Sequence, residues 1–175
     1  MSISLKETIR SIPDFPKKGI VFRDITTLLK DRAAFQQTIS LLVERYRDRS
    51  IDQVCAVEAR GYIFGGALAD RLGCGFVPIR KPGKLPSQTI FEEYELEYGA
   101  GRLEIHADAI TPDKRVLLVD DLLATGGTLA AACRLIERLG GKVVEIAAVI
   151  ELSFLNGRKK LSGYDVFSLV TYETE

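Results

Sequence analysis

Two adjacent carboxylates, Asp120 and Asp121, stand between an apolar run and a loop of small residues. The apolar run at 116–119 is typical of a strand buried in a parallel sheet. The loop consists of Ala124, Thr125, Gly126, Gly127 and Thr128. Its free backbone N–H groups and hydroxyls, followed by the positive end of a helix, suit a phosphate. The order of these features therefore indicates a ligand that has a phosphate at one end and hydroxyls or a metal ion at the other.

Two widespread nucleotide-binding motifs are absent from this stretch. The loop contains no Gly-Lys-Ser/Thr, and no Gly-x-Gly-x-x-Gly occurs, so neither a P-loop nor a dinucleotide-binding fingerprint is present. A buried strand followed by two glycines and a helix is common in α/β proteins, and an acid pair can also be a solvated strand end or a helix cap. The thirteen residues 116–128 taken together are far more specific than any one of these parts.

Residues 116–128 resemble the ribose-phosphate-binding signature of type I phosphoribosyltransferases, which use 5-phosphoribosyl-1-pyrophosphate (PRPP). The resemblance implies that Asp120 and Asp121 contact the ribose hydroxyls and that the loop from Ala124 to Thr128 holds the 5′-phosphate. It also implies the fold: an α/β structure with a mostly parallel twisted sheet, flanking helices and a mobile flap hairpin. The signature identifies the PRPP half of the site and does not name the acceptor.

Four further segments, at 21–25, 58–62, 80–86 and 94–99, resemble the adenine-using members of this family in order and spacing. The implied activity is purine salvage, in which the phosphoribosyl group is transferred to adenine to give AMP and pyrophosphate. Two alternatives stay open: a transferase for hypoxanthine, guanine or xanthine, and a non-catalytic PRPP sensor. Relatives that use 6-oxopurines read the oxygen with a basic side chain, and residues 149–152 contain no lysine, which favours adenine.

Pyrophosphate is a highly anionic leaving group, so the reaction needs Mg²⁺ and basic side chains. The Mg²⁺ is expected to bind mainly through PRPP and water, with Asp120 and Asp121 nearby. Arg60 follows an expected strand and precedes an expected helix, where it suits pyrophosphate. The resemblance assigns it a catalytic role and implies a cis peptide between Ala59 and Arg60.

A basic run follows the expected strand at 75–79 and contains Arg80, Lys81 and Lys84. By itself such a run is more often a solvated surface. Read with the family, the three side chains are pyrophosphate ligands, and some of them can serve a neighbouring subunit.

The segment from 86 to 99 is the expected flap. The resemblance makes Glu97 the acid/base residue near the purine and lets Tyr98 pack over the closed site, which excludes water. The alternative is that Glu93, Glu95 and Glu97 form the solvent face of a hairpin strand.

The expected base-binding residues lie near both ends of the chain. Phe22 offers an aromatic face for stacking, or is a plain core residue. The resemblance implies that the backbone of Val21 and Arg23 reads the 6-amino edge of adenine and that Leu152 forms a pocket wall.

The remaining pattern alternates strands and helices, which predicts a parallel sheet with helices on both faces. Expected strands lie at 53–57, 75–79, 116–119, 143–150 and 166–171, and expected helices lie at 31–47, 61–72, 129–139 and 154–161. We expect a single domain over 1–175, with a base-binding segment at 1–30 and a flap loop and hairpin at 81–106.

Composition restricts the partners. The chain of 175 residues has 24 Lys and Arg against 24 Asp and Glu, so no overall field attracts nucleic acid or a membrane surface. Cys55, Cys74 and Cys133 lack metal-site spacing and suit a reducing compartment. No signal peptide or membrane span is evident. We therefore expect a cytoplasmic enzyme whose partners are adenine and PRPP, and the family implies a homodimer.

Overall fold

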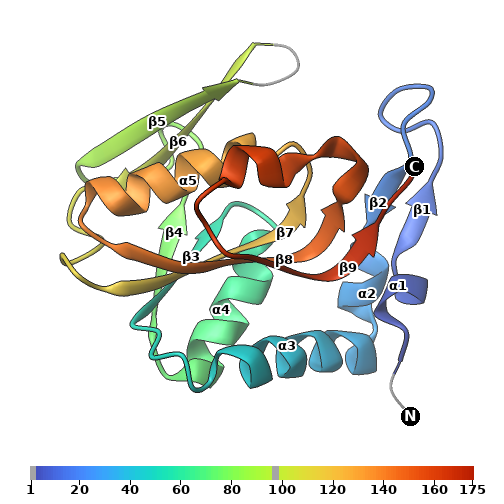
Figure 1. Ribbon diagram of the computed structural model, residues 1–175, viewed down its shortest axis with the longest axis horizontal. Coiled ribbons are helices and arrows are strands. Elements are labelled where there is room, and N and C mark those ends of the chain that lie inside the picture. The colour runs from blue at the N-terminus through green and yellow to red at the C-terminus, as the bar shows by residue number, and fades with distance from the viewer. Residues whose placement is uncertain (1–2, 96–98) are drawn as a thin grey trace.

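Five parallel strands form the central sheet of the computed structural model, which describes residues 3–95 and 99–175 (Figure 1). Their order across the sheet is β4-β3-β7-β8-β9. The strands are β3 (Gln53–Val57), β4 (Gly75–Ile79), β7 (Arg115–Leu123), β8 (Lys142–Leu152) and β9 (Val166–Tyr172). Strand β7 lies at the centre, which is where its uninterrupted apolar run predicts it.

Helices cover both faces of the sheet (Figure 1). Successive residues of β7 alternate between two cores: Leu117 and Val119 pack with α3 (Arg32–Tyr46) and α4 (Gly61–Leu72), whereas Leu118 packs with α5 (Gly127–Arg138). All three side chains are fully buried. Strand periodicity of two therefore fixes which residues of β7 meet each helical layer.

Two small antiparallel units flank this layered structure. Near the N-terminus, α1 (Leu5–Thr8) and α2 (Thr26–Lys30) accompany the pair β1 (Arg10–Ile12) and β2 (Phe22–Asp24). The expected hairpin is formed by β5 (Thr89–Glu95) and β6 (Ala100–His106), and it lies along α5 (Figure 1). Between β8 and β9 the chain makes two short 3-10 helices, η1 (Ser153–Leu155) and η2 (Gly157–Leu161).

The predicted fold class is confirmed, and two local expectations need correction. Strand β7 continues through Leu123, so the acid pair lies inside the strand and not after it. The segment 154–161 is not one helix, because Asn156 adopts a left-handed conformation with φ of 55° and separates η1 from η2. Among the described residues, none of the helices combines the length and apolar character needed to cross a bilayer.

Candidate active site

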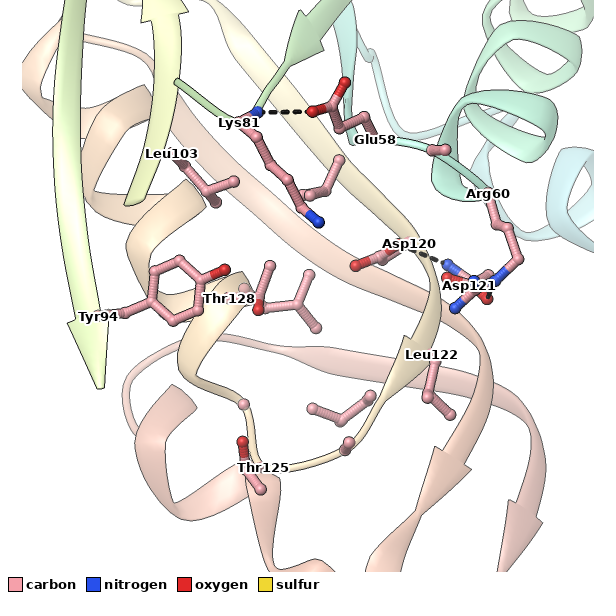
Figure 2. A pocket seen from close by; sticks show the side chains of 16 residues that line it. Glu58, Arg60, Lys81, Tyr94, Leu103, Asp120, Asp121, Leu122, Thr125 and Thr128 are labelled. Atoms are coloured by element: carbon pink, nitrogen blue, oxygen red, sulfur yellow. Dashed lines mark hydrogen bonds and ion pairs between the residues drawn. The ribbon is translucent and has the colours of Figure 1, made fainter. Parts of the chain in front are cut away.

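A cavity of about 430 Å³ lies at the carboxyl ends of β3 and β7 (Figure 2). It brings together most of the residues expected to bind PRPP. Its lining includes Arg60, Lys81, Asp120, Asp121, Ala124, Thr125, Gly126 and Thr128. The carboxyl ends of parallel strands are where open α/β sheets bind ligands, so the topology itself creates this site.

The two carboxylates are buried at the floor of the cavity. Asp120 is 8% exposed and Asp121 is 7% exposed, and an oxygen of Asp120 accepts the Asp121 N–H at 2.8 Å. Burial, reinforced by the neighbouring charge of Asp121, raises the pKa of Asp120 well above its ordinary value. Gly61 makes this packing possible, because a Cβ there would lie 2.8 Å from Asp120 Oδ1.

Arg60, at the start of α4, reaches across to the acid pair. Its Nε lies 2.5 Å from Asp121 Oδ2. Burial acts to lower the pKa of Arg60, but the hydrogen bond and charge of Asp121 outweigh it, and the net shift is upward. The expected pyrophosphate ligand and an expected ribose ligand thus neutralise each other. The cis peptide of this loop joins Glu58 to Ala59, one bond earlier than the resemblance implied.

The three cations of the basic run are placed differently. Lys81 extends into the cavity (Figure 2), whereas Arg80 and Lys84 are not among its lining residues. Arg80 pairs with Glu58 at 2.8 Å and donates to the Lys84 carbonyl at 3.1 Å. Glu58 also accepts the backbone N–H of Lys81 at 2.8 Å.

Glu58 was missed as a site residue, although it stands directly after β3 in the segment that carries Arg60. Its carboxylate holds the start of the basic run beside the cavity. Burial acts to raise the pKa of Glu58, but the hydrogen bonds from Lys81 and Arg80 prevail and lower it. In the sequence, Glu58 is an acidic residue at the end of a strand. That position alone does not show whether the side chain binds substrate or holds other residues in place.

The loop after β7 leads through a left-handed glycine directly into α5. Gly126 precedes α5 with φ of 81°, a left-handed conformation that glycine adopts without strain. Gly127 faces a neighbouring cavity, which Tyr94 and Lys160 also line. Free N–H groups at the start of this twelve-residue helix therefore lie beside the cavity that holds the acid pair.

The hairpin contributes Tyr94, whose ring lies opposite the acid pair (Figure 2). Tyr94 begins the segment 94–99 that carries part of the family resemblance, but it was not among the predicted site residues. Arg134 and Arg138 of α5 hold β5 in place through Glu92, at 3.0 and 2.7 Å. The proposed acid/base residue Glu97 and its neighbour Tyr98 lie outside the described residues.

A second cavity of about 500 Å³ meets the first at Thr125. Two of the expected base-binding residues, Val21 and Leu152, line it together with Phe154, which the sequence did not single out. Lys160 and Glu95 add polar groups at its edge. The apolar part of this lining suits a flat, uncharged ring.

Phe22 and Arg23 are not among the lining residues of either cavity. The ring of Phe22 meets that of Phe15 edge to face, with 5.3 Å between centroids. The guanidinium of Arg23 lies over the Tyr172 ring, 4.0 Å from its centroid. Both side chains therefore pack against neighbouring aromatic rings.

A parallel sheet with an acid pair, a glycine loop and a basic loop at its carboxyl edge is the arrangement expected of a phosphoribosyltransferase. The family model for the phosphoribosyl transferase domain matches residues 24–173. The adenine phosphoribosyltransferase of Thermotoga neapolitana is 56% identical, with 97% of this chain and 100% of the relative covered. Adenine phosphoribosyltransferase 4 of Arabidopsis thaliana is 58% identical, with 96% and 92% covered.

Solved structures agree with the sequence comparisons. The adenine phosphoribosyltransferase of Thermoanaerobacter pseudethanolicus superposes with a TM-score of 0.93 at 57% identity, covering 96% of this chain and 98% of that one. The enzyme from Saccharomyces cerevisiae, complexed with adenine and an imino-altritol bisphosphate, gives a TM-score of 0.89 at 42% identity, covering 94% and 96%. The chain belongs to the adenine phosphoribosyltransferase family.

Proposed function

We propose that the protein transfers the 5-phosphoribosyl group of PRPP to adenine, forming AMP and pyrophosphate in purine salvage. The observation that carries this proposal is a single cavity in which Asp120, Asp121, Arg60, Lys81 and the phosphate loop converge. This cavity shares the lining residue Thr125 with a second, more apolar cavity of about 500 Å³, which has room for a purine. The sequence relatives and solved structures named for adenine give the acceptor.

The reaction exchanges one bond at the ribose C1′ for another. The bond from C1′ to pyrophosphate breaks with its electron pair leaving on pyrophosphate, and a ring nitrogen of adenine bonds to C1′. The proton that adenine loses in this step passes to Glu97, the proposed base. Asp120 and Asp121 accept hydrogen bonds from the ribose hydroxyls and face the positive charge that builds on the ring. Arg60 and Lys81 take the charge of the leaving group.

The proposed acid/base residue is Glu97, with Tyr98 packing over the site, as the family resemblance implies. Arg80 and Lys84 complete the proposed pyrophosphate ligands from the same basic run. Their present partners, Glu58 and each other, keep that run ordered beside the cavity.

Mg²⁺ is the proposed cofactor, and the residues present fit an ion that arrives with PRPP. Among the described residues, no cluster of three or more metal-binding side chains occurs. Asp120 and Asp121 offer two adjacent carboxylates, and Mg²⁺ is commonly held by one or two carboxylates together with substrate phosphates and water. When bound, the ion would neutralise charge on the pyrophosphate.

The acceptor site combines Val21 and Leu152, which line the second cavity, with the proposed contacts of Phe22 and Arg23 beside Val21 in the chain. The backbone at Val21 and Arg23 would read the 6-amino group of adenine. No lysine stands at 149–152 to read a 6-oxo group instead.

The broader organisation is also proposed. We infer a single domain over 1–175 that acts in the cytoplasm without nucleic acid or membrane partners, and a homodimer. Exposed apolar side chains support pairing: Ile63 is 42% exposed on α4, and Phe76 is 37% exposed on β4, an edge strand of the sheet. Three free cysteines fit a reducing compartment.

The deciding experiment is a nucleotide-forming assay with PRPP and Mg²⁺ in which adenine, hypoxanthine, guanine and xanthine are compared. AMP from adenine alone supports the proposal. Turnover of a 6-oxopurine would overturn the acceptor assignment, and PRPP binding without turnover of any base would favour a sensor. Chelation of Mg²⁺ should abolish turnover and be reversed by adding the ion back.

A further inference from the structure

The chain between β8 and β9 packs directly against the phosphate loop. A Cβ added at Gly157 would lie 2.2 Å from the Ala124 carbonyl oxygen, and one added at Gly126 would lie 2.3 Å from the Gly157 carbonyl oxygen. The two backbones therefore touch at both glycines, and neither position has room for a side chain. Gly157 is not among the glycines with a left-handed φ, so space is what requires glycine there.

An ion pair between the half-exposed Arg158 and the buried Glu151 holds the segment that makes this close approach. Arg158, the next residue, donates two hydrogen bonds to Glu151, each 2.7 Å long. It also donates to the Val166 carbonyl at 2.9 Å, and Ser168 donates to Glu151 at 2.6 Å. Glu151 is 4% exposed. These hydrogen bonds tie the start of η2 to β8 and β9. Moving η2 away from the loop would break them and cost free energy.

The same short segment also forms part of the apolar cavity. Leu152, Phe154 and Leu155 line that cavity, and Thr125 of the phosphate loop lines it too. One connection therefore touches the phosphate loop through Gly157 and the proposed base site through the residues just before it. No family signature in the sequence pointed to this connection.

We propose that Gly157 is a positioning residue for the 5′-phosphate of PRPP. It fixes where the Ala124–Gly126 backbone runs and hence where the loop N–H groups point, through direct backbone contact that only glycine permits. In Gly157→Ala, the anchored segment keeps its place and the new methyl group pushes the Ala124 carbonyl and the loop away. The identity of the phosphate ligand rests on the proposed function.

The test measures ribose 5-phosphate binding by calorimetry, together with KM values for PRPP and adenine. We expect Gly157→Ala to raise the Kd for ribose 5-phosphate and the KM for PRPP at least tenfold, while the KM for adenine changes less than threefold. The matched control is Gly66→Ala in α4, where a Cβ meets nothing within 4 Å. This control should stay within twofold of the wild type in all three quantities.

A Gly157→Ala protein that is folded by circular dichroism and keeps the wild-type Kd and KM overturns the inference, as does an equal loss of both substrates. If Gly157→Ala does not fold, Arg158→Gln provides the test, because it weakens the bonds from Arg158 to Glu151 that hold Gly157 in place. A raised Kd for ribose 5-phosphate in this variant supports the inference, and an unchanged Kd overturns it. Absence of AMP formation by the wild type would refute the proposed function alone, because the ribose 5-phosphate comparison needs no turnover.

Discussion

Arg60 Nε and Asp121 Oδ2 lie 2.5 Å apart across the candidate active site. The guanidinium is proposed to bind pyrophosphate and the carboxylate to bind ribose, so the two proposed PRPP ligands are paired with each other in this structure. The side chain of Arg60 is 46% exposed, and solvent screens the pair. The pair therefore keeps the site charge-balanced without strongly opposing substrate entry.

Asp121→Asn separates the binding role of this carboxylate from its structural role. We expect the KM for PRPP to rise about tenfold, equivalent to about 1.4 kcal/mol of binding. The free energy of unfolding should change by no more than about 1 kcal/mol, because the partner arginine is half exposed. Steady-state kinetics and urea unfolding measure the two effects.

The control for this change is Asp113→Asn. Asp113 forms an exposed ion pair with Lys142, with 2.6 Å between Asp113 Oδ1 and Lys142 Nζ. The control substitution should alter neither quantity. A stability loss of several kcal/mol in Asp121→Asn with an unchanged KM would show that the carboxylate is structural.

Asp120→Asn is expected to stabilise the ligand-free protein while lowering its activity. The folded-state pKa of Asp120 is raised by burial, so the stability that this group contributes is present below the ordinary aspartate pKa of about 3.9. It is lost as the pH rises through the folded-state pKa. Asparagine is neutral, so the variant does not lose stability as the pH rises, and its side-chain oxygen still accepts the Asp121 N–H.

Thermal unfolding across pH 4 to 8 checks this prediction. The Tm of Asp120→Asn should exceed that of the wild type at neutral pH, and the gap should narrow as the pH approaches 4. A gap in Tm that does not depend on pH would contradict the raised pKa of the buried Asp120.

Leu152→Ala should affect adenine more than Phe22→Ala does. Leu152 lines the apolar cavity, whereas the ring of Phe22 packs against Phe15. Removing a leucine side chain from a ring-binding surface costs about 1.5–3 kcal/mol, so the KM for adenine should rise about tenfold or more. The KM for PRPP should stay unchanged. A larger effect from Phe22→Ala would show that the ring turns toward the base when substrate binds.

Glu92→Ala should loosen the hairpin that presents Tyr94. Glu92 is held by Arg134 and Arg138, and the three residues form a partly exposed network worth about 1 kcal/mol. We expect faster hydrogen exchange along β5 and a drop of about two- to fivefold in kcat/KM. The neighbouring Glu93→Ala, on the exposed face, is the control. Equal exchange rates in both variants would exclude this anchoring role.

Local sequence patterns predicted the framework because each of its strands and helices has a clear periodicity. The strands at 53–57 and 75–79 and the helix at 61–72 have the predicted bounds. The end of β7 was placed too early, since Asp120 and Asp121 look like a strand end although pairing with β8 carries the strand on to Leu123. Parallel pairing is a long-range property that a local charge pattern does not reveal.

Sequence patterns placed residues at the cavity where that placement follows from their position directly after a strand, as for Ala124, Thr125, Gly126 and Thr128. They missed residues whose role depends on distant contacts. In the sequence, Gly157 looks like an ordinary loop glycine, and only the structure shows its contact with Ala124. Glu58 likewise looks like a surface acid, and only the structure shows its hydrogen bonds with Arg80 and Lys81. Such pairings become visible only when the sheet brings the strand ends together.

The central position of β7 sets the order in which the protein becomes functional during synthesis. Ala56 of β3 pairs with Val119 of β7, and β7 in turn pairs with β8. The ribosome therefore releases β3 long before its central neighbour β7 exists, and the closure of such long loops is slow. Nascent chains that end before β8 should remain aggregation-prone and unable to hold PRPP, so ligand capture marks the end of folding.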